Sequence, residues 1–160
     1  MVGKRRGFLL IVMLAYTVFI GYYLFFANRT INLSWINHGG WTYLQTAMAN
    51  KVNFTPFATI DNYLQKYAIG YIGPVSVWIN IGGNIVAFMP FALFFPALYR
   101  KMKHRIPFYG CWILSLVLIE FTQYLTMSGA MDVDDVILNI FGLIIVYELF
   151  GHRIKPGGTQ

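Results

Sequence analysis

Three carboxylates in the second half of the chain are the residues best suited to chemistry. Glu120 lies inside a long apolar segment, and Asp132 and Asp135 lie where the next apolar segment begins. Two carboxyl groups in different surroundings suit general acid–base chemistry, because one can be protonated while the other is ionised. No Ser, Cys or His accompanies them in the pattern of a nucleophile and its base. We take Glu120, Asp132 and Asp135 as candidate catalytic residues for hydrolysis or group transfer.

Amide side chains accompany these acids and suggest a binding site. On a helix, residues three or four positions apart share a face, which relates Glu120 to Gln123. The same rule puts Asp132, Asp135 and Asn139 on one face and makes Asp134 point away. The candidate ligand-binding residues are Asn53, Pro56, Asn84, Gln123 and Asn139.

Some of these residues also have purely structural interpretations. Asp132 could be the N-cap of a helix that starts after it. Asn84 could form only a hydrogen bond between helices. Gly83 and Ala87, four positions apart, form a small-residue pattern that would let a neighbouring backbone approach closely. Pro90 should kink the helix that contains it, since it removes a backbone donor.

A metal site is a further interpretation of the acids. Carboxylate oxygens are the ligands that Ca²⁺ and Mg²⁺ prefer, so Glu120, Asp132 and Asp135 could hold such an ion and through it a pyrophosphate headgroup. The single cysteine excludes a thiolate zinc site, and the three histidines are scattered along the chain. A divalent cation is therefore the only cofactor that the sequence suggests.

Composition shows what kind of protein must position these residues. The chain has 160 residues, of which 58% are hydrophobic and 11% charged. Soluble domains have about 25% charged residues, and disordered chains have low hydrophobicity and high charge. Too little polar surface remains to cover a soluble globule. The composition therefore predicts an integral membrane protein.

Four segments are long and apolar enough to cross a bilayer as helices, which takes about 20 residues. We expect an all-α membrane protein, a four-transmembrane-helix bundle that forms a single domain over residues 1–160. The first span follows Lys4–Arg6 and is too long for the core of a signal peptide, so we expect it to be retained. The predicted spans are 8–27, 78–98, 107–127 and 133–150.

The cations predict the orientation, because short cytoplasmic loops are enriched in Lys and Arg. If four spans alternate, nine of the twelve cations fall on one side, and both termini are cytoplasmic. Five of the six acids then lie toward the outer face, and Glu148 is at the other end. The excess positive charge is thus explained by topology, and we expect no nucleic-acid partner. The nine cations are Lys4, Arg5, Arg6, Arg100, Lys101, Lys103, Arg105, Arg153 and Lys155.

The segment 28–77 is a long extracytoplasmic loop in this topology. Gly39-Gly40 and Gly73-Pro74 are typical of turns. Segments 41–50 and 60–68 are expected to form short helices at the membrane surface, since the loop is rich in Trp and Tyr.

Four motifs in this order resemble the VanZ-like family of bacterial membrane proteins, over about residues 53–142. Asn53–Phe57 (NFTPF) is similar to the family's N-[LF]-x-P-F segment, and Asn84–Phe91 (NIVAFMPF) to its N-x-x-x-F-x-P-F-G helix, with Ala92 in place of the last Gly. Glu120–Gln123 (EFTQ) matches E-x-x-Q, and Asp132–Asn139 (DVDDVILN) matches D-x-x-D-x-x-x-N. The family usually continues with Thr and several glycines, whereas this chain has Ile140 and then Gly142.

The resemblance implies a role at the outer face of the bacterial cell membrane, associated with lowered susceptibility to teicoplanin-type glycopeptide or lipoglycopeptide antibiotics. It implies no mechanism, so we consider three. The protein could bind or modify a lipid-linked envelope precursor or a lipoglycopeptide at the surface of the bilayer. It could be a membrane-embedded hydrolase or transferase acting on a lipid. It could also be an ion-coupled transporter or a structural bundle, although the apolar inner halves of the spans offer no polar path.

Overall fold

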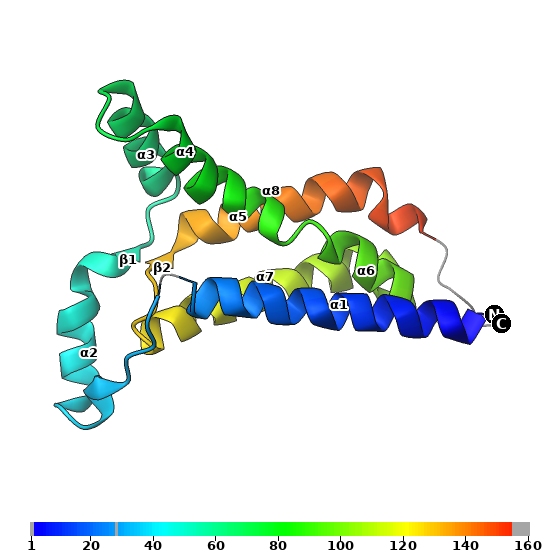
Figure 1. Ribbon diagram of the computed structural model, residues 1–160, viewed down its shortest axis with the longest axis horizontal. Helices are drawn as coiled ribbons and strands as arrows, with labels where there is room; N and C mark the ends of the chain where they lie inside the picture. Colours follow the sequence, from blue (N-terminus) through cyan, green and yellow to red (C-terminus); the bar gives the residue numbers. More distant parts are fainter. Residues whose placement is uncertain (1, 28, 155–160) are drawn as a thin grey trace.

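The structure, a computed structural model, describes residues 2–27 and 29–154 (Figure 1). Asn28, in the predicted loop, and Lys155, among the predicted cytoplasmic cations, lie outside these residues. The α-helices in chain order are α1 (Val2–Phe25), α2 (Gly40–Met48), α3 (Ala58–Ala68), α4 (Pro74–Val77), α5 (Gly83–Ala87), α6 (Phe91–Leu98), α7 (Arg105–Leu125) and α8 (Val133–Leu149). The shorter elements are the 3₁₀ turns η1 (Ser34–Ile36), η2 (Ala49–Lys51), η4 (Arg100–Lys103) and η5 (Gly151–Arg153), the π-helical turn η3 (Trp78–Gly82), and the strands β1 (Val52–Asn53) and β2 (Met131–Asp132).

Three helical stretches in the described part of the chain are long and apolar enough to span a membrane: Lys4–Phe25, Pro74–Leu98 and Arg105–Leu125. They match the first three predicted spans. The second begins earlier than predicted because Pro74, whose fixed φ suits the first turn of a helix, starts α4. The fourth predicted span forms α8, whose 17 residues make it shorter than these three. Among the described residues, three stretches thus meet the length and composition of a span, and α8 packs with them as a shorter helix.

The long helices form a bundle in which α8 contacts α5, α6 and α7, and α1 contacts α6. The start of α1 and the end of α8 lie at the same end of the molecule (Figure 1). The basic turns η4 and η5 contact each other at that end. Arg105 there forms two hydrogen bonds to Glu148, at 2.6 and 2.8 Å. Most of the cations used to predict the orientation are thus gathered at one end of the bundle.

The second stretch is interrupted, as Pro90 predicts. Helix α5 ends at Ala87 and α6 begins at Phe91, because proline has no N–H to continue the helical hydrogen bonding. The backbone carbonyl of Ala87 instead accepts a hydrogen bond from the Tyr16 hydroxyl of α1 at 2.8 Å. A side chain from a neighbouring helix therefore satisfies a carbonyl that would otherwise be unpaired in an apolar environment.

Helices α5 and α8 approach each other closely at Gly142. A Cβ atom at Gly142 would overlap the backbone carbonyl oxygen of Ile85. The prediction that Gly83 provides such an approach is wrong, since the nearest atom to a Cβ at Gly83 would be the Tyr23 hydroxyl at 4.0 Å. The spacing of Gly83 and Ala87 indicated α5, which is the helix that approaches α8, but Gly83 itself does not face α8.

The segment between α1 and α4 packs at the end of the bundle opposite η4 and η5 (Figure 1). It contains α2 and α3, which confirms the helices predicted at 41–50 and 60–68. Leu44 and Met48 of α2 are buried with Tyr124 of α7. Strand β1 pairs in parallel with β2, an element that the all-α prediction lacked. This pairing attaches the segment between α1 and α4, called the outer segment after the loop predicted for it, to the start of α8.

Candidate functional site

The pairing of β1 with β2 places Asn53 beside Asp132. The Asn53 amide donates to Asp132 Oδ1 at 2.9 Å and to the Thr59 hydroxyl at 3.1 Å. Its side-chain carbonyl oxygen accepts from the backbone N–H of Thr55 at 2.9 Å, and the next turn, which includes Pro56, is closed by a bond from the Ala58 N–H to the Thr55 carbonyl at 3.3 Å. Asn53 therefore holds the outer segment against α8. Pro56 is exposed in that turn and shapes the backbone there.

Asp132 is 7% exposed, and hydrogen bonds occupy its carboxylate. Oδ2 accepts from the Thr59 hydroxyl at 2.6 Å, and Oδ1 accepts from Asn53 and from the backbone N–H of Asp134 at 2.9 Å. The last bond makes Asp132 the N-cap of α8, which confirms the structural interpretation of this residue. A carboxylate with this many donors is held in position and keeps little capacity to bind anything else.

Asp134 is fully buried, and the prediction that it points away from the site is wrong. Its carboxylate accepts backbone N–H groups of Phe57, Thr59 and Ile60, at 2.5, 2.8 and 3.2 Å. Helical spacing fails here because Asp132 precedes the helix in extended backbone, with φ −128° and ψ 120°. Asp134 thus caps the N-terminus of α3 from another part of the chain.

The sequence contains a signal for this cap. Helix α3 has Phe57 at its N-cap position, with φ +68°, and no side chain of its own caps it. Phenylalanine cannot accept a hydrogen bond, so the free N–H groups of the first turn need an acceptor from elsewhere. An acidic residue near in space was therefore to be expected, although the sequence could not say which one.

Glu120 and Gln123 are buried on α7 and make contacts with neighbouring backbone. Glu120 Oε2 accepts from the backbone N–H of Asp132 at 3.1 Å. The Gln123 amide donates to the backbone carbonyl of Leu24, at the end of α1, at 3.0 Å. The two side chains share a face, as predicted, and connect α7 to β2 and to α1.

Asp135 lies nearer the open part of the site. It accepts a hydrogen bond from the Asn84 amide across the α5–α8 contact. The Asn139 amide donates to the backbone carbonyl of Asp135 at 2.6 Å. The Asn139 carbonyl oxygen is buried and has no hydrogen-bond partner within residues 2–27 and 29–154. Asn84 and Asp135 therefore form a polar link between α5 and α8.

A cavity of about 210 Å³ opens beside Asn84 and Asp135. Arg29 is the one cation in its lining, and it lies there with two carboxylates. Burial raises the pKa of the Tyr63 hydroxyl, and the nearby charges of Asp135 and Asp132 raise it further, so Tyr63 remains a neutral donor. The polar residues of the lining are Arg29, Thr59, Tyr63, Asn80, Asn84, Asp132 and Asp135.

Sequence reasoning identified only part of this lining. It selected Asn84, Asp132 and Asp135, but used Arg29 only as a charge to be counted and did not single out Tyr63. Both come from the outer segment, and only the folding of that segment onto α8 brings them to the cavity. Five predicted residues do not line the cavity: Asn53, Pro56, Glu120, Gln123 and Asn139.

Apolar surfaces adjoin the polar cavity. A groove of about 500 Å³ shares Tyr23 and Ile79 with it. The rest of the groove is formed by Val75, Trp78, Gly82, Gly83 and Val86. A smaller pocket of about 190 Å³ shares Asp132 with the cavity and is lined by Phe54, Val117, Glu120, Met131, Asp132, Val133 and Val136. A ligand with both a polar and an apolar part could therefore contact continuous surface.

The acids fit a divalent cation poorly. Among the described residues, no three His, Cys, Asp or Glu side chains are arranged to hold a metal ion. The carboxylate oxygens of Asp132 accept hydrogen bonds from Asn53, Thr59 and the backbone. A carboxylate oxygen of Glu120 accepts one from the backbone N–H of Asp132. We derive no role for Ca²⁺ or Mg²⁺ from this donor set.

The profile of the VanZ/LLP1 family matches residues 10–152, nearly the whole chain. The chain belongs to the VanZ/LLP1 family. A search of the curated proteins finds no match, and neither does a search of the solved structures. The resemblance seen in the sequence is thus confirmed.

In this VanZ/LLP1 protein the four motifs meet at one end of the bundle. The NFTPF turn supplies the Phe57 backbone N–H bound by Asp134 and the Asn53 amide bound by Asp132. The EFTQ segment binds the backbone of β2 and of α1. Asn84, which begins the helix motif, binds Asp135. The motif residues therefore mostly build the site, and Asn84, Asp132 and Asp135 are the polar motif residues that also line the cavity.

Proposed function

We propose that this VanZ/LLP1 protein acts at the outer face of the bacterial cell membrane by binding a lipid-linked or lipid-bearing molecule. The observation that carries the proposal is that the polar cavity and the apolar groove adjoin, since Tyr23 and Ile79 line both. The cavity would take a polar headgroup, and the groove would take an acyl chain. Membership of the family supports the link to antibiotic resistance.

The proposed topology is four spans with both termini in the cytoplasm. It is supported by the cations at the η4–η5 end, which suit the cytoplasmic side, and by the packing of α8 among the three long helical stretches. The cavity then faces outward, and α2 and α3 lie at the outer membrane surface. Tagging both termini and testing their accessibility in intact cells would check this arrangement.

The chemistry of the cavity favours a headgroup with several hydrogen-bonding groups. Asp135 can accept from an amine or hydroxyl, Asn84 and Tyr63 can donate, and Arg29 can pair with a phosphate or carboxylate. A lipid-linked envelope precursor has a polar head of this kind on an apolar chain. A lipoglycopeptide of the teicoplanin type also combines hydroxyl and amine groups with an acyl chain.

The test compares variants of the cavity in a teicoplanin-susceptible bacterial host. Expression of the native chain should lower susceptibility, and Asp135→Asn or Asn84→Ala should return it to that of the host alone. Asp61→Asn is the matched control, because Asp61 is an exposed acid of α3 whose carboxylate bonds Gln65. Membrane insertion is checked first. If the cavity variants insert normally and behave like the native chain, the cavity is not the active feature.

A membrane-embedded enzyme is the second candidate. It is favoured by Glu120, a buried carboxylate that lines the small apolar pocket next to Asp132. Asp132 would then orient Glu120 through its backbone N–H, and Glu120 would transfer a proton to or from a lipid substrate. A lipid or peptidoglycan product that disappears in Glu120→Gln would favour this candidate, whereas ligand binding without a product would favour the first.

A further inference from the structure

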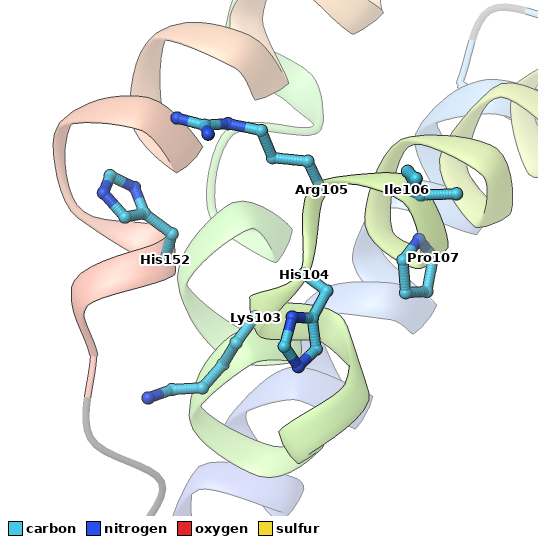
Figure 2. Close-up of a pocket in the computed structure, with 6 residues that line it drawn as sticks. All are labelled: Lys103, His104, Arg105, Ile106, Pro107 and His152. Carbon is cyan, nitrogen blue, oxygen red and sulfur yellow. The ribbon is translucent and has the colours of Figure 1, made fainter.

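A second cavity lies at the η4–η5 end of the molecule, far along the bundle from the polar cavity. Its volume is about 500 Å³, and it is lined by Lys103, His104, Arg105, Ile106, Pro107 and His152 (Figure 2). Lys103 and His104 come from the turn before α7, whereas His152 comes from η5 after α8. Residues from two parts of the chain thus form one basic pocket.

The position of His152 is fixed by packing. The neighbouring Gly151 is buried, and a Cβ atom there would overlap the backbone carbonyl oxygen of Ala92 in α6. His152 Nδ1 lies 3.0 Å from the backbone carbonyl of Tyr147. Since a carbonyl only accepts, Nδ1 carries the proton of this bond, and Nε2 is the ring atom left for a ligand.

The charge of the pocket is not neutralised from within. Glu148 is the acid at this end, and it already binds Arg105 through two hydrogen bonds and Tyr109 through a third, at 2.9 Å. The Lys103 ammonium and the His104 ring make no hydrogen bond to a side chain or carbonyl in the part of the chain that the structure describes. An anion could therefore replace water around Lys103 without breaking an ion pair among residues 2–27 and 29–154.

The pocket also has an apolar rim. Ile106 is 88% exposed, and Pro107 follows it at the start of the long apolar helix α7. A large aliphatic side chain exposed at the end of a spanning helix suits contact with lipid. A soluble phosphate would use the cations alone, whereas a phospholipid would use both the cations and Ile106.

We propose that this pocket binds the phosphate of an anionic glycerophospholipid, with Lys103 and His152 on either side of the headgroup and the acyl chains against Ile106. This site is separate from the polar cavity beside Asn84 and Asp135, and it does not depend on the function proposed for that cavity. Basic pockets between spanning helices are typical headgroup sites.

The experiment uses the purified full chain in detergent and measures the rise of its unfolding temperature with added phosphatidylglycerol. Phosphatidylcholine and inorganic phosphate are added in separate arms. We expect phosphatidylglycerol to stabilise the native chain, and Lys103→Gln to weaken its apparent affinity about fivefold. Lys103→Arg should retain the affinity. Lys101→Gln, which removes the same charge from η4 outside the pocket, should behave like the native chain.

The experiment distinguishes binding in the pocket from non-specific attraction between the lipid and the net charge of the chain. Equal weakening in Lys103→Gln and Lys101→Gln would overturn the proposal, because it would mean that only the total charge matters. Equal stabilisation by phosphatidylcholine or by inorganic phosphate would overturn the assignment to an anionic phospholipid. Circular dichroism of each variant without lipid verifies that the helices are intact, so a lost effect can be assigned to the pocket.

Discussion

The Asn84 amide donates a hydrogen bond to the Asp135 carboxylate, and these two residues lie on α5 and α8, whose backbones come close together at Gly142. Helix α8 can approach α5 because Gly142 has no side chain to meet the Ile85 carbonyl. The polar pair lies at the cavity and the glycine contact lies deeper. The contact of Gly142 with the Ile85 carbonyl thus sets the position of the Asn84–Asp135 pair.

Replacing Asn84 by alanine should destabilise the protein. The change leaves a partly buried carboxylate without this donor, which costs about 1–3 kcal/mol. The free energy of unfolding in detergent would measure it. Asn80→Ala is the control, because the Asn80 amide donates only to the Ser76 carbonyl within its own helical segment. An equal loss in both variants would mean that the Asn84–Asp135 bond adds nothing particular.

The helices could be predicted from the sequence because they are determined by residues within or next to each helix. Long apolar runs gave the spanning stretches, Pro90 predicted the break between α5 and α6, and Gly39-Gly40 and Gly73-Pro74 predicted the turns before α2 and α4. Asp132 as an N-cap was likewise foreseen, since a cap concerns only the first turn of its own helix.

The contacts between distant segments could not be predicted in this way. Asn53 and Asp132 are 79 positions apart, and only the β1–β2 pairing brings them together. Asp132 lies in extended backbone before α8 begins, so helical periodicity does not relate its direction to that of Asp134, two residues later. Gly142 was visible as a glycine, but its contact with Ile85 depends on how α5 and α8 are rotated about their axes.

Replacing Asp134 by asparagine should loosen the outer segment. The carboxylate accepts three backbone N–H groups at the start of α3, and the amide has one acceptor oxygen in place of two. We expect a loss of about 2–3 kcal/mol. Hydrogen exchange of the α3 amides would increase selectively, and Asp61→Asn, at an exposed position of α3, should leave it unchanged. Unchanged protection in Asp134→Asn would contradict the capping role.

Replacing Gly142 by alanine should separate α5 from α8. The added Cβ overlaps backbone, which cannot rotate away as a side chain can, so the loss should be at least about 1–3 kcal/mol. Gly110→Ala is the matched control in α7. Nothing lies within 4 Å of a Cβ at Gly110, so this change should stabilise the helix by about 0.5–1 kcal/mol. Unfolding in detergent measures both, and a stabilising Gly142→Ala would contradict the close approach.

Replacing Tyr16 by phenylalanine should weaken the hold of α1 on the bundle. The hydroxyl satisfies the Ala87 carbonyl that the break before Pro90 leaves free, and its removal should cost about 1 kcal/mol or more. Tyr22→Phe is the control, because Tyr22 is a largely exposed residue of the same helix. The two variants lose the same atom, so their difference in unfolding free energy reports the bond itself. If that difference is zero, the Ala87 carbonyl has another donor, and the break does not require α1.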